Sequence, residues 1–206
     1  RMEDDGVVPQ PVTFKVTVNG EAQGEKTETL TMHSVNDCPY LVDNGKDEEP
    51  TDLKWMFAAY VNEEHPEIDG ILKEALKTGL VDSFTGYQSG NPDVVMAQVF
   101  AIWHVLQRKG IRYSDITTNA GSKHVYSQTV RFLDDSIKAT QANCVDGSVL
   151  MASILRKIGL NVDLVLVPGH CYLAFDLDEK GETLLGLETT MLGSDKLKPV
   201  EHLTKM

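Results

Sequence analysis

Hydrophobic and polar residues alternate in the first part of the chain. The segment VTFKVTVNG has an apolar residue at every second position from Val12 and ends at Asn19-Gly20, a dipeptide typical of tight turns. A second run rich in β-branched residues, KTETLTMHSV, begins at Lys26. The two runs are predicted to be strands that pair as a hairpin or a small sheet. In the next segment, NDCPY, Cys38 precedes a proline, and we expect a loop with a structural cysteine.

After Pro50 the spacing of apolar residues changes to the period of an α-helix. Helices are predicted where a capping residue or a proline precedes this pattern and a glycine follows it. An extended segment and then a short helix are expected in HVYSQTVRFLDDSI. The longer predicted helices are TDLKWMFAAYV with Thr51 as N-cap, PEIDGILKEALKTGL with Pro66 in the first turn, and NPDVVMAQVFAIWHVLQRKG with Asn91 as N-cap.

The most apolar helix is predicted in QANCVDGSVLMASILRKIGL, residues 141–160. Asn143 can cap it, and Asp146 follows three residues later, as in a capping box. Its apolar residues cover most of its circumference, which is typical of a central helix. Strands are predicted next at Val162–Val167, in CYLAFDL and in ETLLGLETT. This order indicates an α+β fold with a central helix on an antiparallel sheet, and we divide the chain into a strand region (1–49) and a core (50–206).

Composition excludes several classes of function. A net charge of −12 without a basic stripe argues against binding to nucleic acid or anionic lipid. No run of about 18 apolar residues occurs, so no membrane span is expected. The three cysteines have no CxxC spacing, the six histidines are scattered, and no Gly-rich phosphate loop is found. We therefore expect no disulfide framework, no metal site and no cofactor.

Cys144 has an unusual position at the start of the central helix. The positive end of the helix dipole and the unpaired N–H groups of the first turn both favour a thiolate, the nucleophilic form of cysteine. Gly147 and Ser148 are small, and we expect them to leave the sulfur accessible. Asp146 works against the thiolate, although a carboxylate there also caps the helix. The position predicts either a nucleophile or a cysteine that only fills the core.

A nucleophilic thiolate needs a base and an acid that orients the base. His170 follows LVLVPG at the start of a strand, from where its side chain can reach a helix terminus. Asp176 lies six residues further along the same strand, roughly 20 Å away, which is too far for a hydrogen bond. If the DEKG segment is a tight turn, the returning strand places Thr190 opposite His170 and Glu188 diagonally across on the same face. The register therefore favours Glu188 over Asp176.

These residues together resemble a known family. The sequence NCVDGSVLMASILRKIGLNVDLVLVPGHCYLAFD…LLGLETT resembles the core of the transglutaminase-like superfamily, which is related to papain-like cysteine peptidases and has bacterial members. In that pattern Cys144 matches the nucleophile, His170 the base and Glu188 the acid. The chain departs from it at Glu188-Thr189, where the family more often has Asp and Pro. The resemblance covers residues 128–190.

The resemblance implies a papain-like fold and a papain-like thiol mechanism on a peptide or protein substrate. A thioester on Cys144 would be hydrolysed by water or taken by an amine, without a cofactor. We expect the Cys144 N–H and a side-chain amide to bind the oxyanion, with Gln128 preferred to Gln141. Tyr172 and Trp103 are candidates for lining the cleft.

Other interpretations stay open at this stage. The same fold could serve as a non-catalytic binding or scaffold module. The chain could also be an unrelated α+β domain in which Cys144 and His170 never meet. Because the chain begins with Arg1, we expect a processed or truncated product, and a signal segment removed before Arg1 would imply an exported protein. Neither substrate identity nor oligomeric state is predicted.

Overall fold

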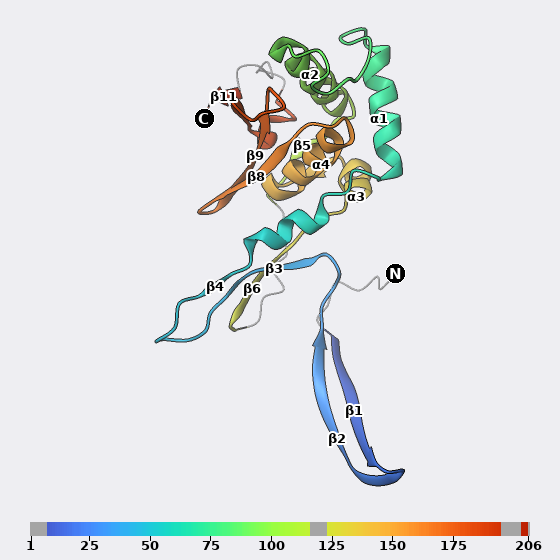
Figure 1. Ribbon diagram of the computed structural model, residues 1–206, viewed down its shortest axis with the longest axis vertical. Helices are drawn as coiled ribbons and strands as arrows, with labels where there is room; N and C mark the ends of the chain where they lie inside the picture. The colour runs from blue at the N-terminus through green and yellow to red at the C-terminus, as the bar shows by residue number, and fades with distance from the viewer. Residues whose placement is uncertain (1–7, 116–122, 195–202, 206) are drawn as a thin grey trace.

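The structure combines helices with antiparallel sheets. The computed structural model describes residues 8–115 and 123–194 and the backbone of residues 203–205 (Figure 1). A long β-hairpin extends away from a body of helices and strands. This arrangement confirms the predicted α+β class. Residues 1–7 of the predicted strand region, and residues 116–122, 195–202 and 206 of the predicted core, lie outside the described part.

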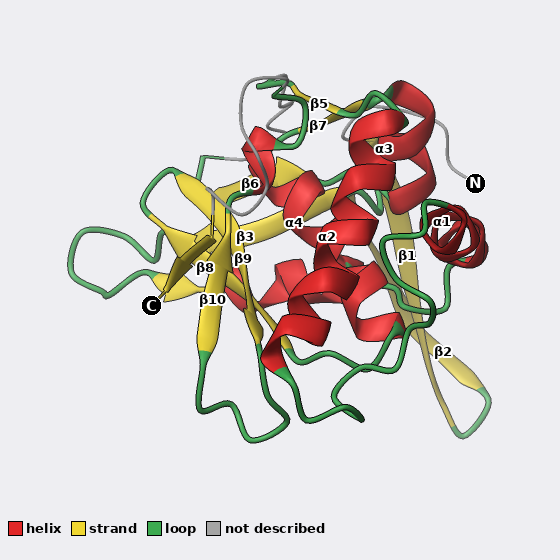
Figure 2. Cartoon of the chain, turned by 90° about the horizontal axis from the view of Figure 1, so that it is seen from above, coloured by secondary structure: helices red, strands yellow, loops and turns green. Residues whose placement is uncertain are grey.

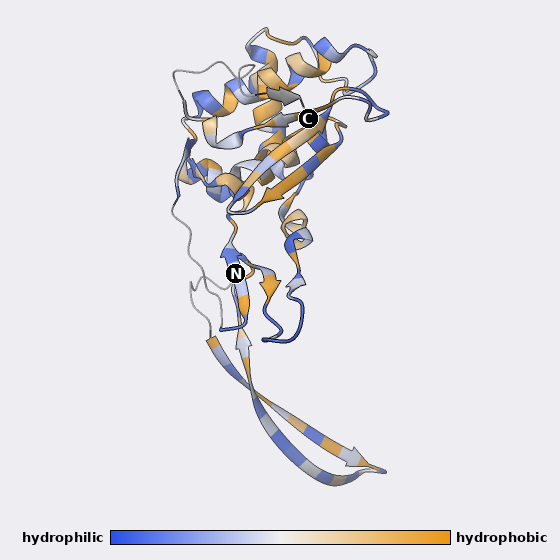
Figure 3. Cartoon of the chain, turned by 90° about the vertical axis from the view of Figure 1, so that its left-hand side faces the viewer, coloured by the Kyte–Doolittle hydropathy of each residue, from blue (hydrophilic) through white to orange (hydrophobic). Residues whose placement is uncertain are grey.

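The hairpin consists of β1 (Val8–Val18) and β2 (Glu21–Met32), which pair antiparallel along their whole length as predicted. Its tight turn uses Asn19 and Gly20, both of which have positive φ angles, 50° and 85°. Along β1 apolar residues alternate with polar ones, and the partners of Val12 and Phe14 on β2 are Glu28 and Lys26, so hydrophobic and hydrophilic residues are mixed along the arm (Figure 3). The large exposed apolar side chains of the arm include Phe14, Val16, Leu30 and Met32.

The larger hydrophobic core lies between three helices and a sheet. The helices are α1 (Pro66–Lys77), α2 (Pro92–Arg108) and α4 (Cys144–Lys157), and the first two begin with proline as predicted. Seen from above, α4 lies between these helices and the strands of the sheet (Figure 2). The buried face of α4 includes nearly every residue from Val145 to Leu155, which confirms the prediction of a central helix.

The main sheet has the strand order β11-β10-β9-β8 and is antiparallel throughout. The central helix α4 packs against β8 and β9. The strand β8 follows α4 in the chain and has the predicted bounds. This sheet therefore places the start of β9 beside the start of α4. The strand bounds are β8 (Val162–Val167), β9 (His170–Asp176), β10 (Leu184–Leu187) and β11 (Leu203–Lys205).

A second sheet shows that the prediction of a loop at Cys38 was wrong. Cys38 lies in β3 (Asp37–Val42), is 1% exposed, and pairs with Gln128 of β6 (Val125–Thr129). The strand tolerates Pro39 because the pairing is irregular between Pro39 and Leu41. The division of the chain at residue 49 stays a prediction, although this ladder joins β3 directly to the predicted core.

The segment after Pro50 also differs from the prediction. Thr51 does not cap a helix but lies in the short strand β4 (Thr51–Asp52), which pairs with β3. The helix that follows is a 3-10 helix, η1 (Lys54–Tyr60), whose first residue is held by the Asp52 carboxylate, 2.9 Å from the Lys54 nitrogen. None of the helices in the described residues is long and apolar enough to cross a membrane. The remaining elements are β5 (Arg112–Tyr113), α3 (Leu133–Ala139), β7 (Gln141–Ala142) and η2 (Thr189–Met191).

Candidate active site

Cys144 is the first residue of α4, and its position is fixed by a complete capping box. The Asn143 side chain accepts a hydrogen bond from the Asp146 nitrogen (2.9 Å), and the Asp146 carboxylate accepts one from the Asn143 nitrogen (3.2 Å). The other Asp146 oxygen accepts from the Arg131 nitrogen (2.9 Å). Asp146 is 1% exposed, so its hydrogen bonds hold the start of the helix rigidly.

The Cys144 thiol is half-buried and surrounded by backbone donors. Burial raises its pKa, while the N–H groups of Cys171, Val145 and Cys144 itself point to the sulfur and lower it, and the Asp146 charge raises it again. The first-turn N–H groups lower the pKa as predicted, but the net direction is upward. Desolvation outweighs the first-turn N–H groups here. The resting group is therefore a thiol that needs a base.

His170 and Glu188 form the hydrogen bond that the register predicts. The His170 Nε2 atom lies 2.6 Å from the Glu188 Oε2 atom. The ladder between β9 and β10 ends at the pair Leu173–Leu187, and Thr189–Met191 form η2, so the predicted strand pairing of Thr190 with His170 is not formed. The predicted contact of Glu188 with His170 is present, although Glu188 caps η2 and does not lie on a strand. Whether the pair acts in catalysis stays a prediction.

Glu188 is held in the ionised form that a histidine partner needs. Burial raises the pKa of Glu188, but hydrogen bonds from Thr190 and His170 outweigh it and lower the pKa below its ordinary value. The Thr190 nitrogen and hydroxyl both donate to Glu188 Oε1, at 3.0 and 2.7 Å. One carboxylate oxygen is thus anchored to the backbone while the other accepts from His170.

The Cys144 sulfur lies close to the backbone that follows His170, and among the described residues no hydrogen bond joins the sulfur to the His170 ring. The Cys171 N–H that points to the sulfur belongs to the residue directly after His170. Because Nε2 of His170 is bonded to Glu188, Nδ1 is the ring nitrogen available to a second partner. The Tyr172 ring stacks near the His170 ring, with centroids 6.3 Å apart, which places Tyr172 beside the site.

Gly147 and Ser148 pack against Thr189, and the prediction that they leave access to the sulfur stays a prediction. A Cβ atom at Gly147 would lie 3.1 Å from the Thr189 Oγ1 atom, so the residue after Glu188 docks directly on the first turn of α4. The Ser148 hydroxyl is fully buried and lies 3.1 Å from Thr189 Oγ1. These small residues let the acid-bearing segment approach the nucleophile-bearing helix.

The other residues predicted to belong to the site do not contact Cys144 or His170 through any hydrogen bond among the described residues. Asp176 lies at the far end of β9, where its backbone oxygen accepts from Tyr87, as expected for a residue excluded from the site. Trp103 is 1% exposed within the larger core and does not line a cleft. Gln128 is half-buried on β6, and in the described residues no hydrogen bond links its amide to Cys144 or His170. Gln141 is exposed on β7. An oxyanion role for either amide stays a prediction.

Sequence reasoning missed Tyr113. The short parallel pairing of β5 with β7 places Tyr113 beside Ala142, two residues before Cys144. Burial raises the pKa of its phenol, and the negative charges of Asp115, Cys144 and Glu188 raise it further, so the hydroxyl lies within electrostatic reach of both site residues. It donates to the Asp115 carboxylate at 3.4 Å. No local pattern could reveal this, because the pairing joins segments about thirty residues apart.

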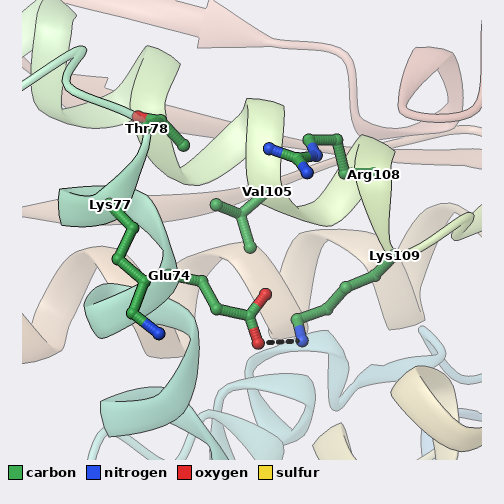
Figure 4. Close-up of a pocket in the computed structure, with 6 residues that line it drawn as sticks. All are labelled: Glu74, Lys77, Thr78, Val105, Arg108 and Lys109. Atoms are coloured by element: carbon green, nitrogen blue, oxygen red, sulfur yellow. Dashed lines mark hydrogen bonds and ion pairs between the residues drawn. The ribbon is translucent and has the colours of Figure 1, made fainter.

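Four hollows in the described part of the chain are lined by residues other than Cys144, His170 and Glu188. One lies between α1 and α2, where Lys109 donates to Glu74 at 2.8 Å (Figure 4). Among the described residues, no group of three or more His, Cys, Asp or Glu side chains is arranged to hold a metal ion. Searches of protein-family models, curated proteins and solved structures found no match to this chain. The family resemblance therefore stays a prediction.

Proposed function

We propose that the protein is a thiol-dependent amide hydrolase or acyltransferase that acts on a peptide or protein through Cys144, His170 and Glu188. The observation that carries the proposal is the 2.6 Å hydrogen bond between His170 Nε2 and Glu188 Oε2, next to a thiol that receives the Cys171 N–H. Nucleophile, base and orienting acid on separate elements are the arrangement that covalent catalysis requires. The papain-like and transglutaminase-like fold is part of this proposal.

In the proposed reaction His170 acts as a general base. Its Nδ1 atom takes the thiol proton as the Cys144 sulfur attacks the amide carbonyl carbon, and the carbonyl oxygen becomes an oxyanion. The imidazolium then protonates the amide nitrogen, which leaves as an amine, and a thioester remains on Cys144. Water or a second amine then attacks the thioester carbonyl, and His170 takes a proton from it. The carbon–sulfur bond breaks, the imidazolium returns the proton to the Cys144 sulfur, and a carboxylic acid or a new amide leaves the site.

The raised pKa of Cys144 favours proton transfer during attack over a preformed ion pair. Glu188 would fix the ring orientation of His170 and stabilise the imidazolium. The N–H groups of Cys144 and Val145, which point to the sulfur, are the nearest donors for an oxyanion.

The test uses casein as a general source of peptide and side-chain amides. Hydrolysis is followed by the appearance of new amino groups or ammonia, and transfer by the incorporation of a fluorescent primary amine. We expect Cys144→Ala to abolish both signals while the circular dichroism spectrum and thermal midpoint stay close to those of the wild type. The proposal fails if a signal persists in Cys144→Ala with the same rate.

A non-catalytic binding module is the second candidate, and one observation favours it. Burial raises the pKa of Cys144 and leaves a neutral thiol at rest, which is also the state of a core cysteine. In that case His170 and Glu188 would serve only as a hydrogen bond that fixes the end of the sheet. Identical reactivity of Cys144 with and without His170 would favour this candidate.

A further inference from the structure

We propose that the groove between β8 and η1 binds an extended peptide, which adds to β8 as a further strand of the main sheet. The strand order β11-β10-β9-β8 places β8 at the edge of that sheet. An edge strand presents unpaired N–H and C=O groups that can pair with another extended chain. The claim that this peptide is the substrate rests on the proposed function, whereas the binding itself does not.

The backbone of β8 has its free groups at alternate residues. Val167 and His170 flank a two-residue turn and therefore form a hydrogen-bonded pair. Because hydrogen-bonded and non-hydrogen-bonded pairs alternate along an antiparallel ladder, Val162, Leu164 and Leu166 direct their N–H and C=O groups away from β9. Among the described residues these backbone groups have no recorded partner. An extended peptide repeats every second residue at about 6.8 Å and matches this spacing.

A groove of about 460 Å³ runs along this edge. Its far wall is η1, where the Trp55 side chain is exposed and the residue retains 71% of its accessible surface. Its floor is α4, through Ala152 and Arg156, and its near wall includes Leu164 and Leu166. A large exposed indole beside an apolar wall is typical of residues that dominate binding to a partner.

The charges of the groove are largely compensated within the protein. Lys54 pairs with Asp52 at 2.8 Å, and the Arg156 guanidinium forms two hydrogen bonds to Glu63. Asp163 also lines the groove and has no ion pair among the described residues, so a strongly acidic ligand is disfavoured. The surface fits a weakly charged segment with apolar side chains at alternate positions. This is the occupant that we assign: an extended, weakly charged peptide.

The groove leads toward the candidate active site. The five steps from Val162 to Val167 span roughly 17 Å at the rise of a strand, and β8 ends at the turn before His170. Leu166 and Cys144 both pack against the same smaller hydrophobic cluster. A peptide of about five residues bound on β8 would therefore extend to the corner that holds the thiol.

The test measures binding of a fluorescein-labelled peptide, KTVTVQVTVK, to the full chain carrying Cys144→Ala, by fluorescence anisotropy. We expect saturable binding that weakens at least about tenfold in Trp55→Ala. Phe14→Ala removes an aromatic ring that is 53% exposed on the β1–β2 hairpin, which among the described residues forms a sheet of its own, and should leave the affinity unchanged. Circular dichroism confirms that each variant is folded.

Two N-methylated peptides test the strand pairing without changing the protein. Methylation of alternate residues in one phase removes the N–H groups that face β8, and methylation in the other phase removes those that face solvent. We expect one phase to lose binding and the other to retain it. The proposal is overturned if no saturable binding occurs, if both phases bind equally, or if Phe14→Ala weakens binding and Trp55→Ala does not.

The same measurements separate this proposal from the proposed function. Binding together with a catalytically inert wild-type Cys144 would support the groove and contradict the catalytic role. Turnover of casein without peptide binding at β8 would support catalysis and contradict the groove.

Discussion

The β1–β2 hairpin and the corner formed by α4, β9 and η2 were both predicted from sequence patterns, yet they differ in how the protein uses them. In the hairpin, apolar side chains such as Phe14 and Val16 are about half exposed, at 53% and 55%. At the corner even the polar groups Asp146 and Ser148 are fully buried and hydrogen bonded. An isolated two-stranded hairpin is marginally stable in water, whereas a corner held by so many partners keeps a fixed geometry. Precise chemistry is therefore expected at the corner.

The largest expected difference concerns the acid. Glu188→Gln should lower the casein activity by about a hundredfold or more, because an amide cannot stabilise the imidazolium of His170 as a carboxylate does. Asp176→Asn, at the opposite end of β9, should leave the activity within about twofold of the wild type, which is the scale of a surface change without a partner at the site. Steady-state rates of casein turnover by the two variants show whether Glu188 or Asp176 is the acid. Equal activities would sink the assignment of Glu188.

Substitution of one valine in each region should change the free energy of unfolding by different amounts. Val149 is 1% exposed on α4, and Val149→Ala should lower the free energy of unfolding by about 2 kcal/mol through lost burial and a small cavity. Val16 lies on the hairpin, and Val16→Ala should change it by less than about 0.5 kcal/mol. Urea unfolding monitored by circular dichroism gives both values. A loss of similar size in Val16→Ala would mean that the hairpin is packed in solution.

Two helical glycines give a smaller but better matched comparison. A methyl group at Gly70 of α1 meets nothing within 4 Å, so Gly70→Ala should stabilise the protein by about 0.5–1 kcal/mol through helix propensity. At Gly147 the same methyl lies 3.1 Å from Thr189 Oγ1, and Gly147→Ala should cancel that gain and reduce activity by moving Glu188. Thermal unfolding and casein turnover are measured on both. Equal stabilisation with full activity in Gly147→Ala would show that the segment after β10 need not dock so closely.

The sequence was sufficient where a local rule determines the geometry. Asn143 and Asp146 form the predicted capping box, and the β9–β10 hairpin brings Glu188 to His170 as predicted, although the ladder ends at Leu187, before the expected pairing of Thr190. Both depend on spacing within one element or across one short hairpin. The turn at Asn19-Gly20 was predictable for the same reason.

The sequence was insufficient where a distant segment determines the environment. Cys38 lies in a strand because β6, some ninety residues later, pairs with it. Gly147 is small because Thr189 packs there, and Tyr113 reaches the site through a parallel pairing with β7. The pKa of Cys144 depends on burial by the fold, which reverses the direction expected from its place at a helix terminus.

The most direct test of the central claim is the pH dependence of iodoacetamide alkylation of Cys144, located by mass spectrometry, in the wild type and in His170→Ala. Cys38 and Cys171 serve as internal controls, because burial raises their pKa values to about 11 and about 12. If His170 is the base, Cys144 should react faster than both, with a rate that already rises below the pH range of an ordinary thiol, and His170→Ala should move this rise to higher pH. If Cys144 instead reacts only above about pH 8.5, with the same profile in both proteins, the thiol has no base and the proposed catalytic function is contradicted.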